Sequence, residues 1–187
     1  MTAATLPIET ATRPWQIDST HTTAEFSVRH LMISTVRGRF AEVAGSVTLD
    51  PANPKSAQLS LSIPVASITT HNEQRDAHLK SADFFDAANY PEITFVGKRI
   101  EGDVESEFKL IGDLTIRGTT KEFVLNARSE GAGGDPWGNE RLGFSGTGKL
   151  NRTDYGLNWN AALEAGGLVV GEDVKVSSDV ELVRPIV

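Results

Sequence analysis

The chain has 187 residues, a formal net charge of −7 and no cysteine. The lack of cysteine excludes a disulfide scaffold, a thiolate zinc site, an iron–sulfur cluster and a cysteine nucleophile. The excess of acidic residues argues against nucleic acid as a partner, and the length is that of one domain.

The first 14 residues are rich in Thr and Ala, and we expect them to form a disordered segment before a single domain over residues 15–187. They lack the basic start and apolar run of a signal peptide. No stretch approaches the roughly 18 apolar residues of a membrane span. The sequence therefore predicts a cytoplasmic protein without an integral membrane segment.

Apolar and polar residues alternate through the first third of the domain, which predicts half-buried antiparallel strands. The first alternating run covers residues 24–30, a second lies near residues 36–49, and a third covers residues 57–65. The prolines after Asp50 and Asn53 predict a turn between the second and third runs.

The pattern changes at residues 71–82, which contain good helix formers and no β-branched residue. Thr70 and Glu73 have the spacing of a capping box, in which Thr70 caps the helix start. Residues 83–92 are expected to form a loop with one helical turn. Together these features predict a short helical insertion around residues 71–85.

Alternation resumes after the insertion, with a glycine-rich loop expected at residues 131–139. The predicted strands are 93–100, 107–117, 123–127, 140–150 and 173–184. About eight short strands with tight turns are typical of an all-β barrel or sandwich. A meander of eight closes into an up-and-down antiparallel barrel, which leaves no exposed edge.

Motifs of nucleotide and hydrolase chemistry are missing from the chain. Gly166 and Gly171 have phosphate-loop spacing, but Glu172 and Asp173 stand where Lys and Ser/Thr are needed. No dinucleotide fingerprint and no Gly-x-Ser-x-Gly elbow is present. The sequence therefore predicts a protein that is not an enzyme and has no cofactor.

Two of the four histidines, His71 and His78, are seven residues apart on the expected helix or its approach, about two turns and roughly 10 Å from each other. They cannot chelate one ion by themselves, so no metal site is predicted. His30 is expected to share an inward face with Phe26 and Val28. It is either a core histidine satisfied by a hydrogen bond or a polar group at the rim of a ligand cavity.

An eight-stranded barrel is just wide enough to be filled by side chains or to hold one apolar ligand. Small residues at inward positions are expected to leave volume for a ligand. They are Ala24, Ala57, Gly97, Gly112, Ala127, Gly146 and Gly148. The alternative is that they form bulges or pack against Trp15, Trp137 or Trp159.

Several segments, which follow one another in the family's order over about residues 15–183, carry a family resemblance. They are Trp15 to His21, Phe26 to His30, Ser34 to Phe40, Ala66 to Thr70, Gln74 to Phe85, Tyr90 to Phe95, Gly112 to Gly118 and Asn151 to Gly156. In this set the chain closely resembles the YceI-like, polyisoprenoid-binding proteins of bacteria. The most specific piece is His-Leu-x-Ser-x-Asp-Phe-Phe, which begins at His78.

The resemblance implies an extended lipocalin-like barrel of eight antiparallel strands whose hydrophobic channel holds an isoprenoid quinone or a polyprenyl phosphate. It also implies a homodimer, and fatty-acid-like ligands in some members. Many members carry a signal peptide and are exported, and this chain departs from them in lacking one. The expected channel lining is Phe26, Val28, Leu59, Leu61, Phe84, Phe85, Ile93, Phe95, Leu110, Leu114, Phe123, Leu125, Phe144 and Trp159. The candidates for contact with a polar or anionic head group are His30, Arg37, Arg75 and His78.

Three hypotheses follow for the function. The first is a carrier, store or sensor of a long-chain isoprenoid, since each buried CH₂ contributes roughly 0.8 kcal/mol. The second is a lipid isomerase or hydrolase that uses His30, or His78 with Asp83, although no complete set of nucleophile, base and orienting group can be read from the sequence. The third is a structural or stress-response protein whose interior is filled by its own side chains.

Overall fold

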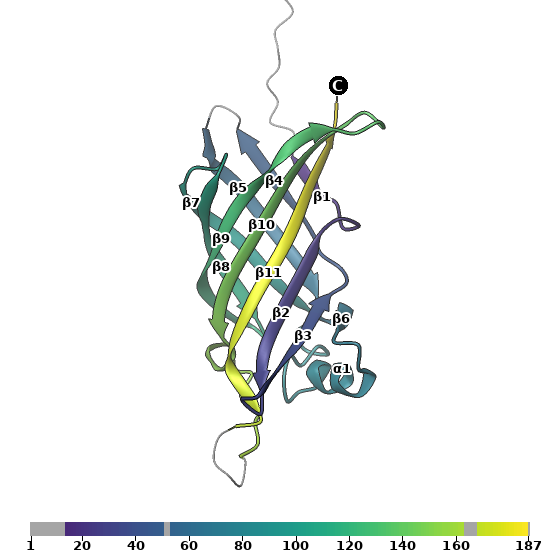
Figure 1. The fold of residues 1–187 in the computed structure, drawn as a ribbon, viewed down its shortest axis with the longest axis vertical. Coiled ribbons are helices and arrows are strands. Elements are labelled where there is room, and N and C mark those ends of the chain that lie inside the picture. Colours follow the sequence, from purple (N-terminus) through teal and green to yellow (C-terminus); the bar gives the residue numbers. More distant parts are fainter. Residues whose placement is uncertain (1–13, 51–52, 163–167, 187) are drawn as a thin grey trace, which may run out of the picture.

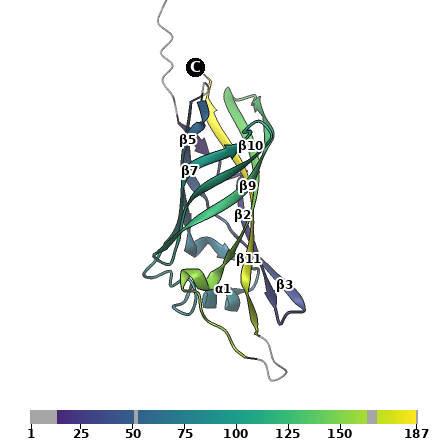
Figure 2. The same cartoon turned by 90° about the vertical axis from the view of Figure 1, so that its left-hand side faces the viewer.

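The computed structural model describes residues 14–50, 53–162 and 168–186, so most of the N-terminal segment expected to be disordered lies outside the described residues. One long antiparallel sheet curls into a tall barrel, and a short helix lies across its lower end (Figures 1 and 2). The strands are β1 Trp15–Ile17, β2 Thr23–His30, β3 Ser34–Phe40, β4 Ala44–Asp50, β5 Asn53–Pro64, β6 Ile68–Thr69, β7 Glu92–Gly102, β8 Glu107–Ile116, β9 Thr119–Gly134, β10 Asn139–Asn151 and β11 Val170–Pro185. The helical elements are η1 Val65–Ser67, α1 Glu73–Lys80 and η2 Arg152–Tyr155.

The eleven strands occupy eight positions around the barrel, because three positions are each shared by two consecutive strands. The upper half of β11 pairs with β1 and its lower half with β2. In the same way β3 pairs with β2 while β4 pairs with β1, and β6 pairs with β3 while β5 pairs with β4. The prediction of an eight-stranded, lipocalin-like barrel with one short helix is therefore confirmed.

The single run expected over residues 36–49 is instead two strands, interrupted between Phe40 and Ala44. The interruption lets β3 and β4 meet different partners. The strand β1 was not predicted, because its three residues are too few to show an alternating pattern. The expected glycine-rich loop is shorter than predicted, because β9 continues to Gly134.

The helix is shorter than the insertion predicted around residues 71–85 and begins differently. Asn72, not Thr70, caps α1, because its side chain accepts a hydrogen bond from the backbone N–H of Arg75. Thr70 is buried instead, and its hydroxyl donates to Asp76 Oδ1 over 2.5 Å. The helix is thus tied to the end of β6 by side chains that the capping-box pattern does not contain.

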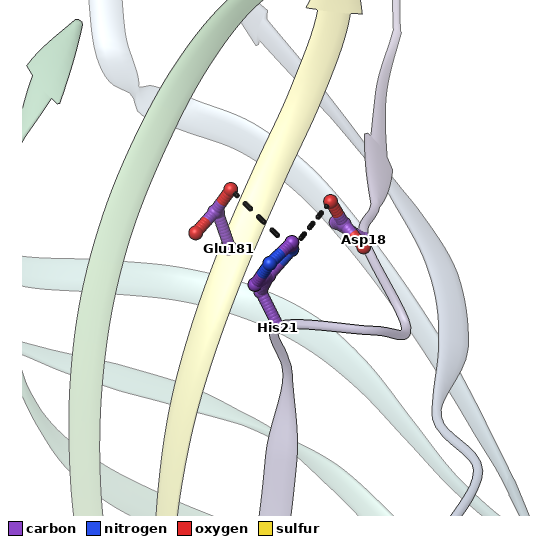
Figure 3. Close-up of side chains that lie close together, drawn as sticks. All are labelled: Asp18, His21 and Glu181. Atoms are coloured by element: carbon purple, nitrogen blue, oxygen red, sulfur yellow. Dashed lines mark hydrogen bonds and ion pairs between the residues drawn. The ribbon is translucent and has the colours of Figure 1, made fainter. Parts of the chain in front are cut away.

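A polar network on the outer face closes the barrel where β1 ends. The Arg141 guanidinium on β10 donates to Asp18 Oδ2 over 2.7 Å, to Asp135 Oδ2 over 2.7 Å, and to Glu181. His21 Nδ1 lies 3.0 Å from Asp18 Oδ2, and Figure 3 shows both side chains beside Glu181 of β11. These contacts join β10, β11 and the β1–β2 turn at the closing seam.

The network holds its carboxylates in their charged form. Hydrogen bonds from Arg141 and His21 place the pKa of Asp18 well below its ordinary value. Burial raises the pKa of Asp135, but hydrogen bonds from Asn139 and Arg141 outweigh this effect and lower it well below the ordinary value. The same carboxylates raise the pKa of Arg141.

Arg152 fastens the lower end of the barrel. This buried guanidinium donates to the carbonyls of Leu157, Trp159, Val170 and Gly171, with Nε 2.9 Å from the oxygen of Gly171. Burial lowers its pKa from the ordinary value. One side chain therefore joins the segment after η2 to the start of β11.

We expect Arg152→Met to lower the free energy of unfolding by about 3 kcal/mol or more, because buried carbonyls left without donors cost about 1–3 kcal/mol each. Urea denaturation followed by tryptophan fluorescence measures this change. Arg99→Met is the control, since Arg99 pairs with Glu101 and Glu122 on the exposed surface and its loss should change stability little. Equal effects of the two variants would contradict the assigned role.

Acid should weaken the closing seam. A carboxylate whose pKa is lower in the folded state stabilises the protein above its unfolded pKa of about 4, and this stabilisation is lost as the pH falls below that value. Urea midpoints measured from pH 7 to pH 3 should therefore fall less steeply for Arg141→Gln, which starts from a lower stability. Lys98→Gln, which breaks an exposed pair with Asp113, should keep the wild-type slope.

Candidate functional site

The interior of the barrel is lined by alternate residues of every strand. Across β10 and β11, for example, Leu142 faces Leu182, Phe144 faces Val180 and Leu150 faces Val174. The neighbouring residues, such as Lys149 and Lys175, point outward and are exposed. Since directly paired residues point to the same face of a sheet, the strand register assigns each side chain to the inside or the outside.

The inner wall is apolar, and much of it remains partly accessible to solvent. The inward-facing Phe95, Leu114 and Phe123 are buried, but many other inward side chains at mid-height are half-buried. They include Phe26, Val28, Leu61, Leu110, Leu125, Phe144, Val176 and Val180. In a completely filled core these large side chains would be fully enclosed. The partial exposure therefore indicates a lumen with an accessible apolar wall.

Between the two rims, the inward positions of the described strands carry no charged side chain. Their polar members are small, such as Ser129 of β9 and Ser178 of β11. Charged residues in register with the inner face stand at the rims, as Glu140 and Arg184 do at the upper one. An apolar chain fits such a wall, because a charge placed there would be desolvated without a partner.

Phenylalanine rings cover three of the inward glycines. A Cβ atom at Gly38 would lie 2.4 Å from Cζ of Phe26, and one at Gly148 would lie 2.5 Å from Cζ of Phe123. At Gly112 the corresponding atom is Cζ of Phe95, at 2.6 Å. The expectation that these glycines leave free volume is therefore wrong at Gly112 and Gly148, and their partners are phenylalanines rather than tryptophans. The glycines let large rings lie against the wall.

Trp15 fills the upper end of the barrel, where it packs with Val47 and Leu182. The Arg184 guanidinium lies 4.1 Å from the ring centroid and also donates to Glu140 over 2.5 Å. The indole Nε1 of Trp15 is buried and has no hydrogen-bond partner among the described residues. Sequence reasoning missed this end as a site, because β1 is too short to assign Trp15 to a face.

Aromatic residues from outside the sheet fill the lower end. The His78 ring of α1 meets Trp159 edge-on at 4.8 Å and Phe84 edge-on at 5.1 Å. Its Nε2 lies 2.9 Å from Asp83 Oδ2. Tyr155, from η2, is buried in the same cluster, and burial raises its pKa. The insertion thus supplies the floor of the barrel.

The structure brings the predicted lining residues together on the inner side. Those in the main core cluster or packed against it are Leu59, Leu61, Phe84, Phe85, Ile93, Phe95, Leu110, Leu114, Phe123, Leu125 and Trp159. Phe144 packs against the upper cluster, while Phe26 contacts Phe40, which belongs to the lower one. Val28 faces inward opposite Val36 and Val174.

The four head-group candidates are not brought together. Arg37 lies opposite Ser27 on the outer face and is exposed, so it does not face the lumen. Arg75 is engaged by Thr70, with Nε 2.7 Å from the hydroxyl and Nη2 2.9 Å from the carbonyl. His30 is half-buried at the lower end of the inner face, and His78 stands in the aromatic floor. Alternation along β3 already places the Arg37 side chain on the other face of the strand from Val36 and Gly38.

Asp18, His21 and Glu181 offer ligand atoms within 4.8 Å of one another, which is a spacing compatible with a metal ion. However, the Arg141 guanidinium already binds both carboxylates. A cation would have to displace this arginine from the seam. We therefore interpret the group as an ion-pair network that closes the barrel (Figure 3).

Two shallow hollows of about 600 and 480 Å³ lie on the outer surface of the wall. Their rims include the exposed residues Lys109, Arg128, Lys149 and Lys175, which alternate with the inward side chains. The first hollow is also lined by Phe108, Ala127 and Gly146, which the register places on the inner face. Among the described residues no helix has the length and apolar character that a membrane span requires.

The sequence model of the YceI-like domain family matches residues 15–182 of this chain. The chain belongs to the YceI-like family. A UPF0312 protein of Staphylococcus aureus strain MSSA476 is 40% identical over 165 residues, which cover 88% of this chain and 94% of that protein. The family membership places the apolar lumen in a group of proteins with shared architecture.

Two solved structures show how this YceI-like chain compares in three dimensions. The YceI protein of Campylobacter jejuni is 33% identical, covers 97% of each chain and gives a TM-score of 0.68. A polyisoprenoid binding domain from Saccharophagus degradans shares the fold, with a TM-score of 0.66, 15% identity and coverage of 91% of this chain and 98% of that one. These comparisons show that the fold is shared.

The glycine–phenylalanine contacts predict a clear difference between two glycines of β10. Gly148→Ala should push the Phe123 ring into the lumen and lower the free energy of unfolding by about 1–3 kcal/mol, as overpacking does. Gly143→Ala is the matched control, because its Cβ would meet its nearest neighbour, Glu130 Cβ, at 3.4 Å. Urea denaturation gives the stability, and a crystal structure of Gly148→Ala shows the ring. A Phe123 ring that stays in place would contradict the expected clash.

Proposed function

We propose that the protein binds a long-chain isoprenoid lipid inside the barrel and acts as its carrier or store. The observation that supports this best is the apolar, uncharged and partly accessible inner wall between two aromatic ends. A chain of isoprene units buries many CH₂ groups, each contributing roughly 0.8 kcal/mol, so binding needs few polar contacts. The predicted lining residues, from Phe26 to Trp159, are proposed to contact this chain.

The electrostatics favour a neutral head group, such as that of an isoprenoid quinone. Arg37 points outward, Arg75 is bound to Thr70, and Arg152 donates to four carbonyls. No described arginine or lysine points into the lumen between its rims to neutralise a phosphate. A polyprenyl phosphate would therefore have to keep its head group in solvent. The proposed polar contacts for a quinone are His30 and His78 at the lower end.

Binding is tested first on the purified protein. Extraction with organic solvent and mass spectrometry should reveal a co-purifying isoprenoid. Added quinone at about 100 times its Kd should raise the free energy of unfolding by about 2.7 kcal/mol, seen as a higher Tm. The matching polyprenyl phosphate should raise it less. No bound lipid and no shift with either compound would contradict the proposed function.

Two neighbouring residues of β9 test whether the lipid lies inside. Leu125 faces the lumen opposite Leu110, and Val124 faces outward opposite Ile111 with 38% of its surface exposed. Leu125→Trp should fill the lumen and weaken quinone binding at least about tenfold, while Val124→Trp should not. Quenching of tryptophan fluorescence by the quinone measures the affinity, and a circular-dichroism melt confirms that both variants fold. Equal affinities would place the lipid elsewhere.

A further inference from the structure

The hairpin between β2 and β3 ends in an exposed apolar tip, which we define as residues 31–33. Ile33 is 79% exposed and Met32 is 56% exposed. The backbone N–H of Leu31 donates to the carbonyl of Val169, next to Leu168, which is 37% exposed. Large apolar side chains from two segments therefore gather at one point of the surface.

The tip has an unusual backbone for its residues. Leu31 and Met32 have φ angles of 51° and 60°, and the N–H of Ile33 donates to the carbonyl of His30 over 3.1 Å. This is the geometry of a tight hairpin turn, in which Asn and Gly are preferred because left-handed angles strain other residues. Leu31 and Met32 are thus strained, and Met32 is also exposed to water. Neither property helps the barrel to fold.

The charge around the tip differs from that of the chain as a whole. Residues 26–41 contain three arginines and no acidic residue, in a protein with a net charge of −7. Arg37 and Arg39 are exposed on the outer face of β3, where the exposed Glu25 of β2 lies directly opposite Arg39 and Arg37 has only Ser27 opposite. On neighbouring β11, Glu172 and Asp173 are exposed, and Asp173 is paired with Lys149 over 2.7 Å. Arg29 holds the turn, with Nη2 2.6 Å from the carbonyl of Met32.

The position of the tip relates it to the lumen. Figures 1 and 2 show that the hairpin projects from the lower end of the barrel, beyond the ring of closed strands. His30 and Val28, which precede the tip, belong to the inner wall. Among the described strands, β3 pairs along its second edge with β6 only at Arg39 and Phe40, so Ser34 to Gly38 form a free edge. The wall is thus unpaired beside the apolar tip.

We propose that this tip docks on the surface of an anionic lipid bilayer, with residues 31–33 in the acyl boundary and Arg37 and Arg39 at the head groups. A projecting point of apolar side chains beside basic ones suits a bilayer, which is apolar below a charged surface. The proposal has a second half, which rests on the proposed function: the isoprenoid passes between bilayer and lumen at the free edge of β3.

Docking is tested by co-sedimentation with vesicles of phosphatidylglycerol and phosphatidylcholine, without added isoprenoid. The double variant Met32→Ser, Ile33→Ser should bind at least about tenfold more weakly, because it removes two apolar side chains from the contact. Trp137→Ser is the matched control, since Trp137 is also 79% exposed but lies in the turn between β9 and β10 at the upper end. This control should bind as the wild type does.

The charge contribution has a separate readout. Arg37→Gln with Arg39→Gln should reduce binding to anionic vesicles severalfold and leave the weaker binding to pure phosphatidylcholine unchanged. Wild-type affinity of the double serine variant, or an equal loss for Trp137→Ser, would overturn the proposal. A wild-type dimer in sedimentation velocity that the double serine variant breaks would also overturn it, since the tip would then contact a second copy.

The proposed passage of the isoprenoid at the edge of β3 is tested by transfer of a fluorescent isoprenoid quinone from these vesicles to the protein. The double serine variant should take up the quinone at least about tenfold more slowly and bind it with wild-type affinity in detergent. Because docking is measured without isoprenoid, its loss is distinguishable from a failure of the proposed function. Equal uptake rates for variant and wild type would overturn the route through the tip.

Discussion

Closure of the barrel depends on β1, a strand of three residues that pairs with β4 on one side and β11 on the other. Without these pairings the upper part of the barrel would be open, because the β3–β6 pairing joins the wall only in its lower part. Three residues supply few backbone hydrogen bonds, so side chains reinforce the seam. Trp15 packs from the inside, while Arg141 joins Asp18, Asp135 and Glu181 from the outside.

The closed wall sorts side chains by chemistry. Charged residues lie outside or at the rims, where water solvates them, and the inner face between the rims is mostly apolar. The inner wall is not a solid core, because several large side chains remain half-buried and three inward glycines receive rings from neighbouring strands. Two of these rings, Phe95 and Phe123, are buried and meet edge-on with their centroids 6.5 Å apart. The barrel thereby combines a buried cluster in its lower part with half-buried apolar side chains elsewhere on the inner wall.

The two ends of the barrel differ in construction, so the lumen is closed differently at its upper and its lower end. The upper end is filled by Trp15 beneath the Arg184–Glu140 pair. The lower end is covered by elements outside the sheet, α1 and η2, and Arg152 ties the segment that follows η2 to β11 through backbone carbonyls. Beside this lower end the hairpin of β2 and β3 extends past the closed strands. The proposed lipid binding, with the proposed entry at the lower end, would account for this asymmetry.

The class of fold and the face on which each strand residue lies follow from local sequence patterns. Alternation is a local property, so Phe26, Leu61 and Phe123 could be assigned to the inner face without knowing their partners. The helix was located for the same reason, although its cap is Asn72 and not Thr70. The family resemblance in the segments from Trp15 to Gly156 pointed to a lipid in the lumen.

Tertiary structure alone decided how the strands share positions and which groups meet. The pairing of β1 with two distant strands, the contacts of Arg141 and Arg152, and the rings over the inward glycines join residues far apart in the chain. No local pattern encodes such contacts, because they depend on the register between strands. The grouping of Arg37 with His30 as head-group candidates was a different kind of error, because alternation with Val36 and Gly38 already puts Arg37 on the outer face. The paired strands place Arg37 outside and His30 at the end of the inner face, where it leads to the exposed hairpin tip.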